Sequence, residues 1–517
     1  MARSLQRSKA PEVLLSKKIV SQMSQIKQGA ILSYFNLGLN VLIGLVYTPW
    51  MISSIGKADY GLYTLAMSII GLLAFDFGLG NATTKFICEY LAHDRQDKVN
   101  ALLGLVFKLY LALDALIFLV FMGVYIFLPD IYEGLTVSEM GAFKVVFIIA
   151  ACYCILSFPF IPLNGILTGY EKFVQLKSCD LFQRIFIVIT MAICLIYGYG
   201  LYALVIVNSA AGIITIALKL LVIKSKTPLK VNIRFWDNAE LKRIFGFVIW
   251  VTVIALSQRM IFNIAPSILG IFADSAQIAV LGVAITIEGY TYLFANAISG
   301  MFLPRVSKMV AGKDVSAVQK LMVRVGRLQL FICGFIFIWF AVFGREFINL
   351  WVGPGYSAVY LCTLLFLIPI VIQLPQEIGI TYIIAANKVR TQSYIYIGMA
   401  AINLVLAIPL SKFYGVTGLA VAIFTAFSYR TIALDLMFHK RMGLNMIVFF
   451  RDTFGRLLLP FALTTIIMIL SNLIPVESWF GLILKSIVAT VIFSIVLMTF
   501  GANKEEKTLI KSIIFRR

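Results

Sequence analysis

Histidine and acidic residues are scarce in this 517-residue chain. Only two histidines occur, His93 and His439, and 24 acidic residues stand against 44 Lys and Arg. The seven cysteines show no paired spacing and have too few histidines nearby, which argues against a zinc site and against a disulfide framework. We expect the cysteines to pack as small hydrophobic residues, and we predict no metal and no other cofactor.

Charge of either sign is also rare, at 13% of the residues, whereas 61% are hydrophobic and the mean hydropathy is +0.95. A soluble domain has too little interior to bury so much apolar surface, so the composition favours a polytopic membrane protein. The net charge of +20 would suit a nucleic-acid partner, but the basic residues form short clusters between apolar runs. They lack interleaved aromatic residues, so we expect no nucleic-acid binding.

The chain contains enough long apolar runs to predict an all-α protein with fourteen transmembrane helices, because each run can cross a hydrocarbon core of about 30 Å. The predicted spans are 29–54, 59–86, 100–128, 142–168, 179–198, 201–223, 244–271, 276–303, 321–347, 357–385, 391–411, 416–438, 456–474 and 479–500.

The loops between these runs alternate in charge. Loops 224–243 and 304–320 are strongly basic, as are both termini, while the loops on the opposite side hold few cations. Lys and Arg concentrate on the cytoplasmic side of membrane proteins, so both ends are predicted to be cytoplasmic. Residues 1–28 are basic and polar, and we expect no cleavable signal there.

An internal repeat divides the predicted spans into two sets of six. Asp59 and Asp274 are 215 residues apart, and Pro159 and Pro375, both inside apolar runs, are 216 apart. An even number of spans gives both copies the same orientation, which is the parallel type of transporter repeat. The predicted order is a basic N-terminus (1–28), an N-lobe (29–223), a linker (224–243), a C-lobe (244–438), a second linker (439–455), two extra helices (456–500) and a cytoplasmic tail (501–517).

Several ionisable residues fall inside predicted spans, where each costs roughly 2.5–3.5 kcal/mol to insert. Asp76, Arg259 and Glu288 lie on polar helix stripes of spans 2, 7 and 8, which are expected to line a cavity between the lobes. Either acid can instead form a structural ion pair with Arg259. Glu377 follows Pro375, which marks either a helix-break site or a simple kink.

Other buried charges remain open. Arg184 and Lys108 lie toward the cytoplasmic ends of their spans, where long cationic side chains can extend to the interface. Asp114 and Arg430 lie deeper, and their roles cannot be assigned from sequence.

The segment GKADYGLYTLAMSIIGLLAFDFGLGNATTKFI, residues 56–87, resembles the second span of bacterial polysaccharide repeat-unit flippases, the O-antigen or Wzx-like family. That family belongs to the multidrug/oligosaccharidyl-lipid/polysaccharide exporter superfamily. The motif covers only this stretch, while the plan of six, six and two spans covers the whole chain.

The resemblance implies a flippase, not an enzyme, in the bacterial cytoplasmic (inner) membrane. It would move a polyprenyl-diphosphate-linked oligosaccharide to the outer leaflet by alternating access without ATP, and no Walker A sequence occurs. Arg259 is the expected diphosphate contact, because the planar guanidinium can bind two phosphate oxygens at once. Arg184 and Lys108 are expected to guide entry of the substrate from the basic cytoplasmic face. The expected sugar contacts are Asn36, Asn40, Asn263, Tyr292 and Asn296.

The resemblance implies further partners. Asp76, Glu288 and Glu377 are candidates to bind H⁺ or Na⁺ and couple an ion gradient to transport. The two extra helices resemble a pair that forms a groove for the polyprenyl tail in related flippases. Membrane lipids and other polysaccharide assembly proteins are the remaining expected partners.

Two alternatives remain. A multidrug and toxin exporter of the same superfamily would typically carry an acid in span 1 for cation coupling, where this chain has Asn36 and Asn40. A membrane glycosyltransferase or polysaccharide polymerase would resemble chains with a large extramembrane segment, which is missing here.

Overall fold

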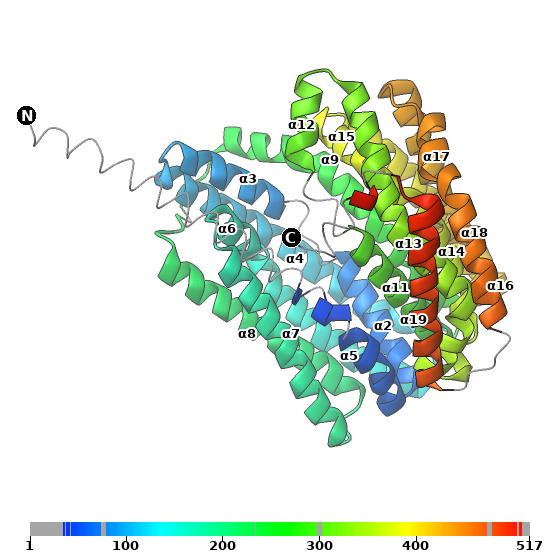
Figure 1. Ribbon diagram of the computed structural model, residues 1–517. Helices are drawn as coiled ribbons and strands as arrows, with labels where there is room; N and C mark the ends of the chain where they lie inside the picture. The colour runs from blue at the N-terminus through cyan, green and yellow to red at the C-terminus, as the bar shows by residue number, and fades with distance from the viewer. Residues whose placement is uncertain are drawn as a thin grey trace, which may run out of the picture. The chain divides into compact units, whose positions relative to one another are not determined.

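The computed structural model describes residues 35–36, 38–41, 43–73, 79–232, 234–296, 302–472, 478–503 and 506–508. These residues form helices and connecting turns without any β-strand (Figure 1). The chain divides into two compact units, residues 1–256 (unit 1) and 257–517 (unit 2). Twelve helices in the described residues are long and apolar enough to cross a membrane, which makes this a multi-pass membrane protein.

Unit 1 begins with a helix over Gly38–Ile55. A capping box starts α5, because the Thr136 and Glu139 side chains each accept the other's backbone N–H. The helices that follow the first are α2 (Lys57–Leu73), α3 (Leu79–Ala92), α4 (Gln96–Ile131), α5 (Val137–Ser157), the 3₁₀ turn η1 (Phe158–Phe160), α6 (Leu163–Gly169), α7 (Phe173–Ile196), α8 (Leu201–Lys226) and α9 (Asn238–Phe262), whose last turns belong to unit 2.

Unit 2 continues with a second series of helices. Its longest uninterrupted helix, α13, starts at an N-cap in which Asp314 accepts a hydrogen bond from the N–H of Ala317 at 2.8 Å. The elements are α10 (Ala265–Phe272), α11 (Ser275–Asn296), α12 (Leu303–Ala311), α13 (Val315–Trp351), η3 (Pro354–Tyr356), α14 (Ala358–Gln373), η4 (Leu374–Gln376), α15 (Glu377–Ala385), α16 (Val389–Arg441), α17 (Met446–Thr453), η5 (Gly455–Leu457), α18 (Leu458–Ser471), α19 (Trp479–Val496) and η6 (Leu497–Gly501).

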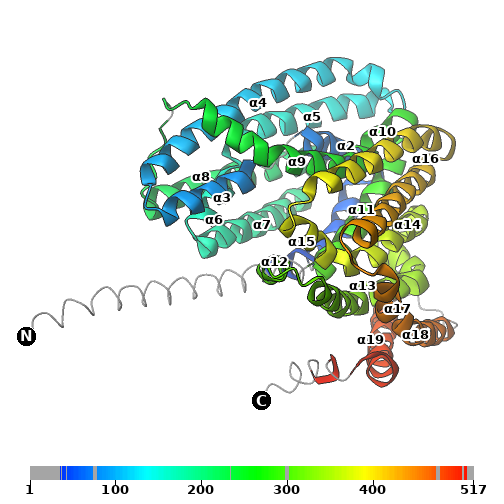
Figure 2. The same cartoon turned by 90° about the horizontal axis from the view of Figure 1, so that it is seen from above.

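The difference between twelve spans and the fourteen predicted has two sources. A straight helix over the 53 residues of α16 would be about 80 Å long, far more than a bilayer core requires. Gly415, with φ 56° and ψ −138°, breaks it, and Figure 2 shows the chain turning back on itself there. Predicted span 59–86 corresponds to α2 and α3, and residues 74–78 lie outside the described residues. The count of fourteen stays a prediction.

Both units contain the same interrupted helix. In unit 1, α5 passes through the 3₁₀ turn η1, which contains Pro159, and continues as α6. In unit 2, α14 passes through η4, which contains Pro375, and continues as α15. Proline removes an intrahelical hydrogen bond, which explains why each helix tightens at this position.

The turn that ends each interrupted helix is also repeated. Glu171 and Asn387 both adopt a left-handed backbone, with φ of 58° and 54°. The N–H of Lys172 donates to the carbonyl five residues earlier at 2.8 Å, and that of Lys388 does the same at 3.0 Å. This is the hydrogen-bond pattern of a helix C-cap in which one residue is left-handed. The shared spacing and geometry support the internal duplication.

Two basic segments predicted as loops contain short helices. α12 lies in predicted loop 304–320, and α17 lies in predicted linker 439–455. These helices have only nine and eight residues and include charged side chains, so neither produces an apolar run that a hydropathy profile would detect. The predicted loop and linker therefore each contain a short helix that the sequence analysis did not foresee.

The two C-terminal spans pack on α13 inside unit 2. Phe493 of α19 stacks on Phe335 of α13, with ring centroids 4.8 Å apart, and on Phe461 of α18 at 5.7 Å. Lys485 of α19 is 9% exposed and its Nζ lies 3.2 Å from a carboxylate oxygen of Glu346 on α13. Aromatic packing and a partly buried ion pair therefore fix α19 against α13.

A buried ion pair also fixes the segment that follows α19. Arg327 of α13 and Glu506 are 2% and 4% exposed. The guanidinium donates to both carboxylate oxygens, at 2.6 and 2.9 Å, and to the carbonyls of Asp452 and Gly501 at 2.9 and 2.7 Å. Both oxygens of the Glu506 carboxylate thus accept hydrogen bonds from the same guanidinium.

This pair can be tested by removing its charges singly and together. Arg327→Met and Glu506→Met should each lower the free energy of unfolding by about 3–5 kcal/mol, because each leaves one buried charge without its partner. The double variant should recover most of that loss. Thermal unfolding of the detergent-purified protein, followed by tryptophan fluorescence, measures all three.

Arg451→Met is the matched control, since the exposed Arg451 also pairs with a neighbouring acid, Asp452, at 3.1 Å. It should change the unfolding temperature little. Single variants at 327 and 506 that behave like this control would contradict the structural role of the buried pair.

Candidate functional site

Unit 1 contains a polar cavity of about 490 Å³ between the start of its first helix and helices α7 and α8. Seven of its eight lining side chains are polar or charged. This composition is unusual in a transmembrane unit, where ionisable groups generally face a ligand or water pathway. The lining residues are Asn36, Asn40, Lys177, Asp180, Gln183, Arg184, Ile187 and Asn208.

Hydrogen bonds and ion pairs hold one side of this cavity in place. The amide of Asn36 donates to the backbone carbonyl of Lys177 at 3.2 Å, which ties the first helix to α7. Asp180 accepts from the Nζ of Lys219 at 2.9 Å, and Lys219 also donates to Asn164 at the same distance. Lys177 lies 3.6 Å from Asp180. Among the described residues that line the cavity, the only acid is therefore already paired with two lysines.

Two polar atoms at the cavity are buried without a partner in the structure. They are the Oδ1 of Asn40 and the Nε of Arg184. Buried polar groups are nearly always hydrogen-bonded, and leaving one unpaired costs roughly 1–3 kcal/mol. Atoms that tolerate this cost next to a cavity are candidates to contact a ligand. Arg184 supplies a donor and a positive charge, and Asn40 supplies an acceptor.

Unit 2 contains a second polar centre, formed by ionisable residues inside its spans. Glu288 on α11 is 8% exposed, and Arg430 on α16 is 2% exposed. The charge of Arg430 interacts with both Glu288 and Glu377, the first residue of α15. Tyr292, one turn after Glu288, interacts with the same three side chains. Glu288, Glu377 and Tyr292, selected separately from sequence, therefore lie in one centre.

Arg430 is positioned in this centre by aromatic rings. Its guanidinium carbon lies 4.8 Å from the ring centroid of Phe427 and 5.4 Å from that of Tyr396. Its Nε and one terminal nitrogen are buried without a hydrogen-bond partner. A desolvated cation over aromatic faces gains on the order of 2 kcal/mol. This leaves two guanidinium donors available beside two carboxylates.

Other predicted site residues do not line the unit 1 cavity. Arg259 and Asn263 lie at the end of α9, both partly buried, and the Asn263 N–H donates to the Arg259 carbonyl at 2.9 Å. Asn403 of α16 donates to the Met260 carbonyl at 3.0 Å and anchors this end of α9 within unit 2. The assignment of Arg259 to the diphosphate and of Asn263 to the sugar stays a prediction.

Lys108 holds the basic linker in place. Its Nζ donates to the carbonyl of Phe235 at 3.1 Å and lies 5.5 Å from the ring centroid of Trp236. Its guiding role stays a prediction. Asp76 lies outside the described residues, as does the side chain of Asn296. Within the described ranges, no three His, Cys, Asp or Glu side chains gather closely enough to hold a metal ion.

Comparison with known proteins places this architecture in a family. Residues 26–310, more than half of the chain, match the family described as polysaccharide biosynthesis protein. The chain belongs to this family. The predicted family resemblance is confirmed by this match, and the solved structures that share the fold belong to the multidrug/oligosaccharidyl-lipid/polysaccharide exporter superfamily. No curated protein matches this polysaccharide biosynthesis family member in sequence.

Solved structures of that superfamily share the fold. The lipid II flippase MurJ in an inward closed conformation is 13% identical, with 94% of this chain and 98% of that chain covered and a TM-score of 0.66. An inward-facing MATE multidrug resistance transporter is 13% identical, with 78% and 98% covered and a TM-score of 0.64. The Vibrio cholerae MATE transporter VcmN in its bent form is 15% identical, with 81% and 98% covered and a TM-score of 0.55.

Sequence reasoning missed several residues of this polysaccharide biosynthesis family member. Asp180 and Lys219 lie inside predicted spans, so their cost in a bilayer was a usable signal. Arg430 was noticed, but its role was left open. Asn208 gave no signal, because an amide within an apolar helix can also bond its own backbone, as it does here to Leu204 at 2.7 Å.

The unit 1 cavity should bind an anion through Arg184. Arg184→Gln should weaken binding of inorganic pyrophosphate about tenfold or more, because it removes a charge-assisted hydrogen bond. Arg184→Lys should restore binding only in part, since lysine lacks the planar fork. Isothermal titration calorimetry of the detergent-purified protein measures the affinity.

Lys226→Gln is the control, because Lys226 is an exposed cation at the end of α8 that does not line the cavity. Equal affinities for the Arg184→Gln and Lys226→Gln variants would rule out this cavity as the anion site.

Proposed function

We propose that this protein is a flippase that moves a polyprenyl-diphosphate-linked oligosaccharide from the inner to the outer leaflet of the bacterial cytoplasmic membrane. The observation that carries the proposal is the unit 1 cavity, which combines an incompletely bonded guanidinium with a set of amide side chains inside a membrane-spanning unit. Membership of the polysaccharide biosynthesis family supports a sugar-containing substrate.

The cavity's chemistry fits both parts of the polar headgroup. A diphosphate loses its hydration in a membrane protein and needs cations in return, which Arg184 and Lys177 provide. Sugar hydroxyls need partners that both donate and accept, which the amides of Asn40, Gln183 and Asn208 provide. Arg259, with Asn263, Tyr292 and Asn296, remains a second proposed set of headgroup contacts, and Lys108 a proposed guide at the cytoplasmic end.

An apolar groove in unit 2 fits the lipid tail. It has a volume of about 390 Å³ and is formed by α13 and α19, the second of the extra C-terminal spans. Trp339, Phe347 and Trp479 lie along it with aliphatic residues of α19. Its polar side-chain groups are the hydroxyls of Ser486 and Thr490 and the two indole N–H groups, of which that of Trp339 donates to Ser486 at 3.0 Å. A polyprenyl chain requires such a surface, which supports the tail groove implied by the family resemblance.

The polar centre of unit 2 fits ion coupling. Glu288 and Glu377 outnumber the single cation Arg430 among these three side chains, and Asp435 on α16 lies beside Gln376 as a further carboxylate. Excess negative charge inside a membrane is energetically unfavourable, so binding of H⁺ or Na⁺ would lower the free energy of this centre. Binding and release of that cation can then drive alternation between inward- and outward-facing states. Asp76 remains a third proposed site for the coupling ion.

A drug exporter is the competing proposal, because MATE transporters share the fold. Residues 35–55 contain no acid, in contrast to the span 1 acid expected for such exporters. A glycosyltransferase or polymerase is disfavoured, because the solved structures with this fold are flippases and transporters.

Reconstituted transport distinguishes these functions. Proteoliposomes containing the wild-type protein should move a polyprenyl-diphosphate oligosaccharide across the bilayer and should not transport a cationic dye. Arg259→Ala in the same assay separates the two proposed headgroup contacts: sugar movement at least tenfold slower would assign Arg259 to the substrate, and unchanged movement would leave Arg184 as the principal cation. Dye transport without movement of the lipid-linked sugar would support the exporter and refute the flippase.

A further inference from the structure

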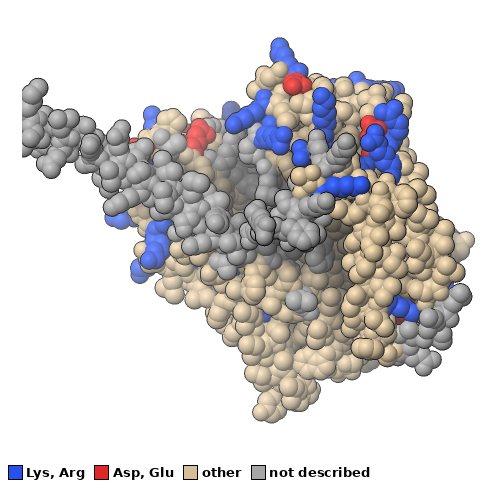
Figure 3. All heavy atoms as spheres, in the orientation of Figure 1, with Lys and Arg blue, Asp and Glu red and all other residues tan. Residues whose placement is uncertain are grey.

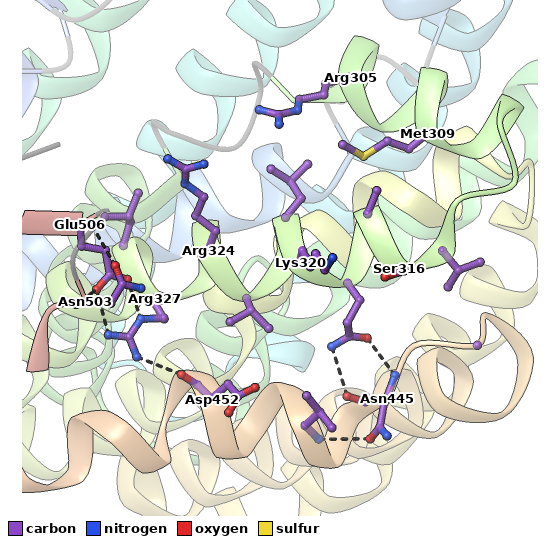
Figure 4. A pocket seen from close by; sticks show the side chains of 18 residues that line it. Arg305, Met309, Ser316, Lys320, Arg324, Arg327, Asn445, Asp452, Asn503 and Glu506 are labelled. Carbon is purple, nitrogen blue, oxygen red and sulfur yellow. Dashed lines mark hydrogen bonds and ion pairs between the residues drawn. The ribbon is translucent and has the colours of Figure 1, made fainter. Parts of the chain in front are cut away.

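A large pocket lies at one end of unit 2, and none of its lining residues belongs to the polar centre formed by Glu288, Glu377 and Arg430. It has a volume of about 940 Å³ and is formed by α12, α13, α17 and the segment that contains Asn503 and Glu506 (Figure 4). Four cations line it, namely Arg305, Lys320, Arg324 and Arg327. Figure 3 shows that Lys and Arg gather at the end of unit 2 where α12 and α17 lie, above a broad uncharged surface.

Both ends of this pocket are fixed by hydrogen bonds. At one end, Gln319 of α13 donates to the carbonyl of Asn445 at 3.2 Å and accepts from its N–H at 2.9 Å. At the other end, Arg327 binds Glu506 and the carbonyls of Asp452 and Gly501. Arg327 therefore builds the wall of the pocket, and four of its five N–H donors are already occupied. A preformed pocket loses less conformational entropy when a ligand binds.

The remaining cations are placed to act together. Lys320 and Arg324 are one turn apart on α13 and so share a helix face. Arg305 extends from α12 on the opposite side, and Figure 4 shows its guanidinium and that of Arg324 reaching into the same open space. All three side chains belong to exposed residues.

The two acids of the pocket are paired with other groups. Glu506 is held by Arg327 at 2.6 Å. Asp452 lies 3.1 Å from Arg451 and 3.9 Å from Arg456, neither of which lines the pocket. The lining therefore presents a positive surface to a ligand.

We propose that this pocket binds a phosphate group, carried either by the headgroup of an anionic phospholipid or by a soluble diphosphate. Guanidinium and ammonium groups from two helices suit the several oxygens of a phosphate. The basic end of unit 2 corresponds to loops predicted to face the cytoplasm, where anionic lipids attract clustered cations. Ile447 on α17 is 75% exposed beside this end, which suits contact with lipid. The proposal is independent of the transported substrate.

The test uses the full-length protein and compares pocket cations with a matched neighbour. Native mass spectrometry after extraction from bilayers of phosphatidylcholine and phosphatidylglycerol counts retained anionic lipid, and calorimetry measures inorganic pyrophosphate binding in the Arg184→Gln background. Lys320→Gln/Arg324→Gln and Arg305→Gln should weaken phosphate binding about tenfold for each cation removed. Lys308→Gln is the control, because Lys308 is exposed on α12 but does not line the pocket.

The two measurements separate the two sources of phosphate. Retained phosphatidylglycerol that is lost in the pocket variants, without pyrophosphate binding, identifies a lipid site. Pyrophosphate binding that is lost in the same variants identifies a soluble ligand. Pocket variants that behave like Lys308→Gln in both measurements, or a wild-type protein that binds neither probe, would overturn the proposal.

Discussion

A bilayer core offers no water to a buried charge, so every ionisable side chain inside this protein must be stabilised by neighbours from the chain itself. In unit 2, Arg430 is stabilised by two aromatic faces and by the charges of Glu288 and Glu377. Unlike Arg327, which donates four hydrogen bonds, Arg430 has buried donors without a partner. All three nitrogens of Arg327 donate hydrogen bonds that fix the fold, whereas two nitrogens of Arg430 have no partner at a candidate coupling site.

The same contrast separates structural from functional polar groups in unit 1. Lys108 and Lys219 are engaged by carbonyl or carboxylate partners that hold helices and linker together. Arg184 and Asn40 face the cavity with an unpaired buried atom each. Buried polar groups that are fully bonded add rigidity, whereas incompletely bonded ones are retained at a cost in stability. We therefore propose that the unpaired atoms of Asn40, Arg184 and Arg430 serve substrate and ion binding, and that Lys108 and Lys219 serve the fold.

Much of the fold can be predicted from the sequence, because the length of an apolar run and the spacing of a repeat can both be read directly along the chain. Hydropathy gave most spans, and the 216-residue offset between Pro159 and Pro375 corresponds to the repeated helix interruption. The short helices α12 and α17 could not be predicted, since eight or nine residues are too few to produce an apolar run. These helices, together with the C-terminal segment, form the basic pocket of unit 2, which sequence reasoning therefore missed.

The candidate sites were predictable only as separate residues. Glu288 and Glu377 lie inside predicted spans, where a charge is costly to insert, so the sequence marked each of them as unusual. Their proximity to Arg430, however, depends on how α11, α15 and α16 pack. Likewise, Asn36 and Arg184 were selected individually, and only folding shows that α7 brings them to one cavity. Residue chemistry is local information, whereas the pairing of residues more than a hundred positions apart is set by tertiary packing.

We propose that the charges of the unit 2 centre are retained for transport and not for stability. The most direct test replaces all three charges at once, with Glu288→Gln, Glu377→Gln and Arg430→Met, and measures thermal unfolding and transport in proteoliposomes on the same preparation. A buried ionic cluster exchanged for neutral residues of similar volume is often as stable or more stable. We predict an unchanged or higher unfolding temperature with transport abolished. Transport at the wild-type rate, or a protein that no longer folds, would contradict the account.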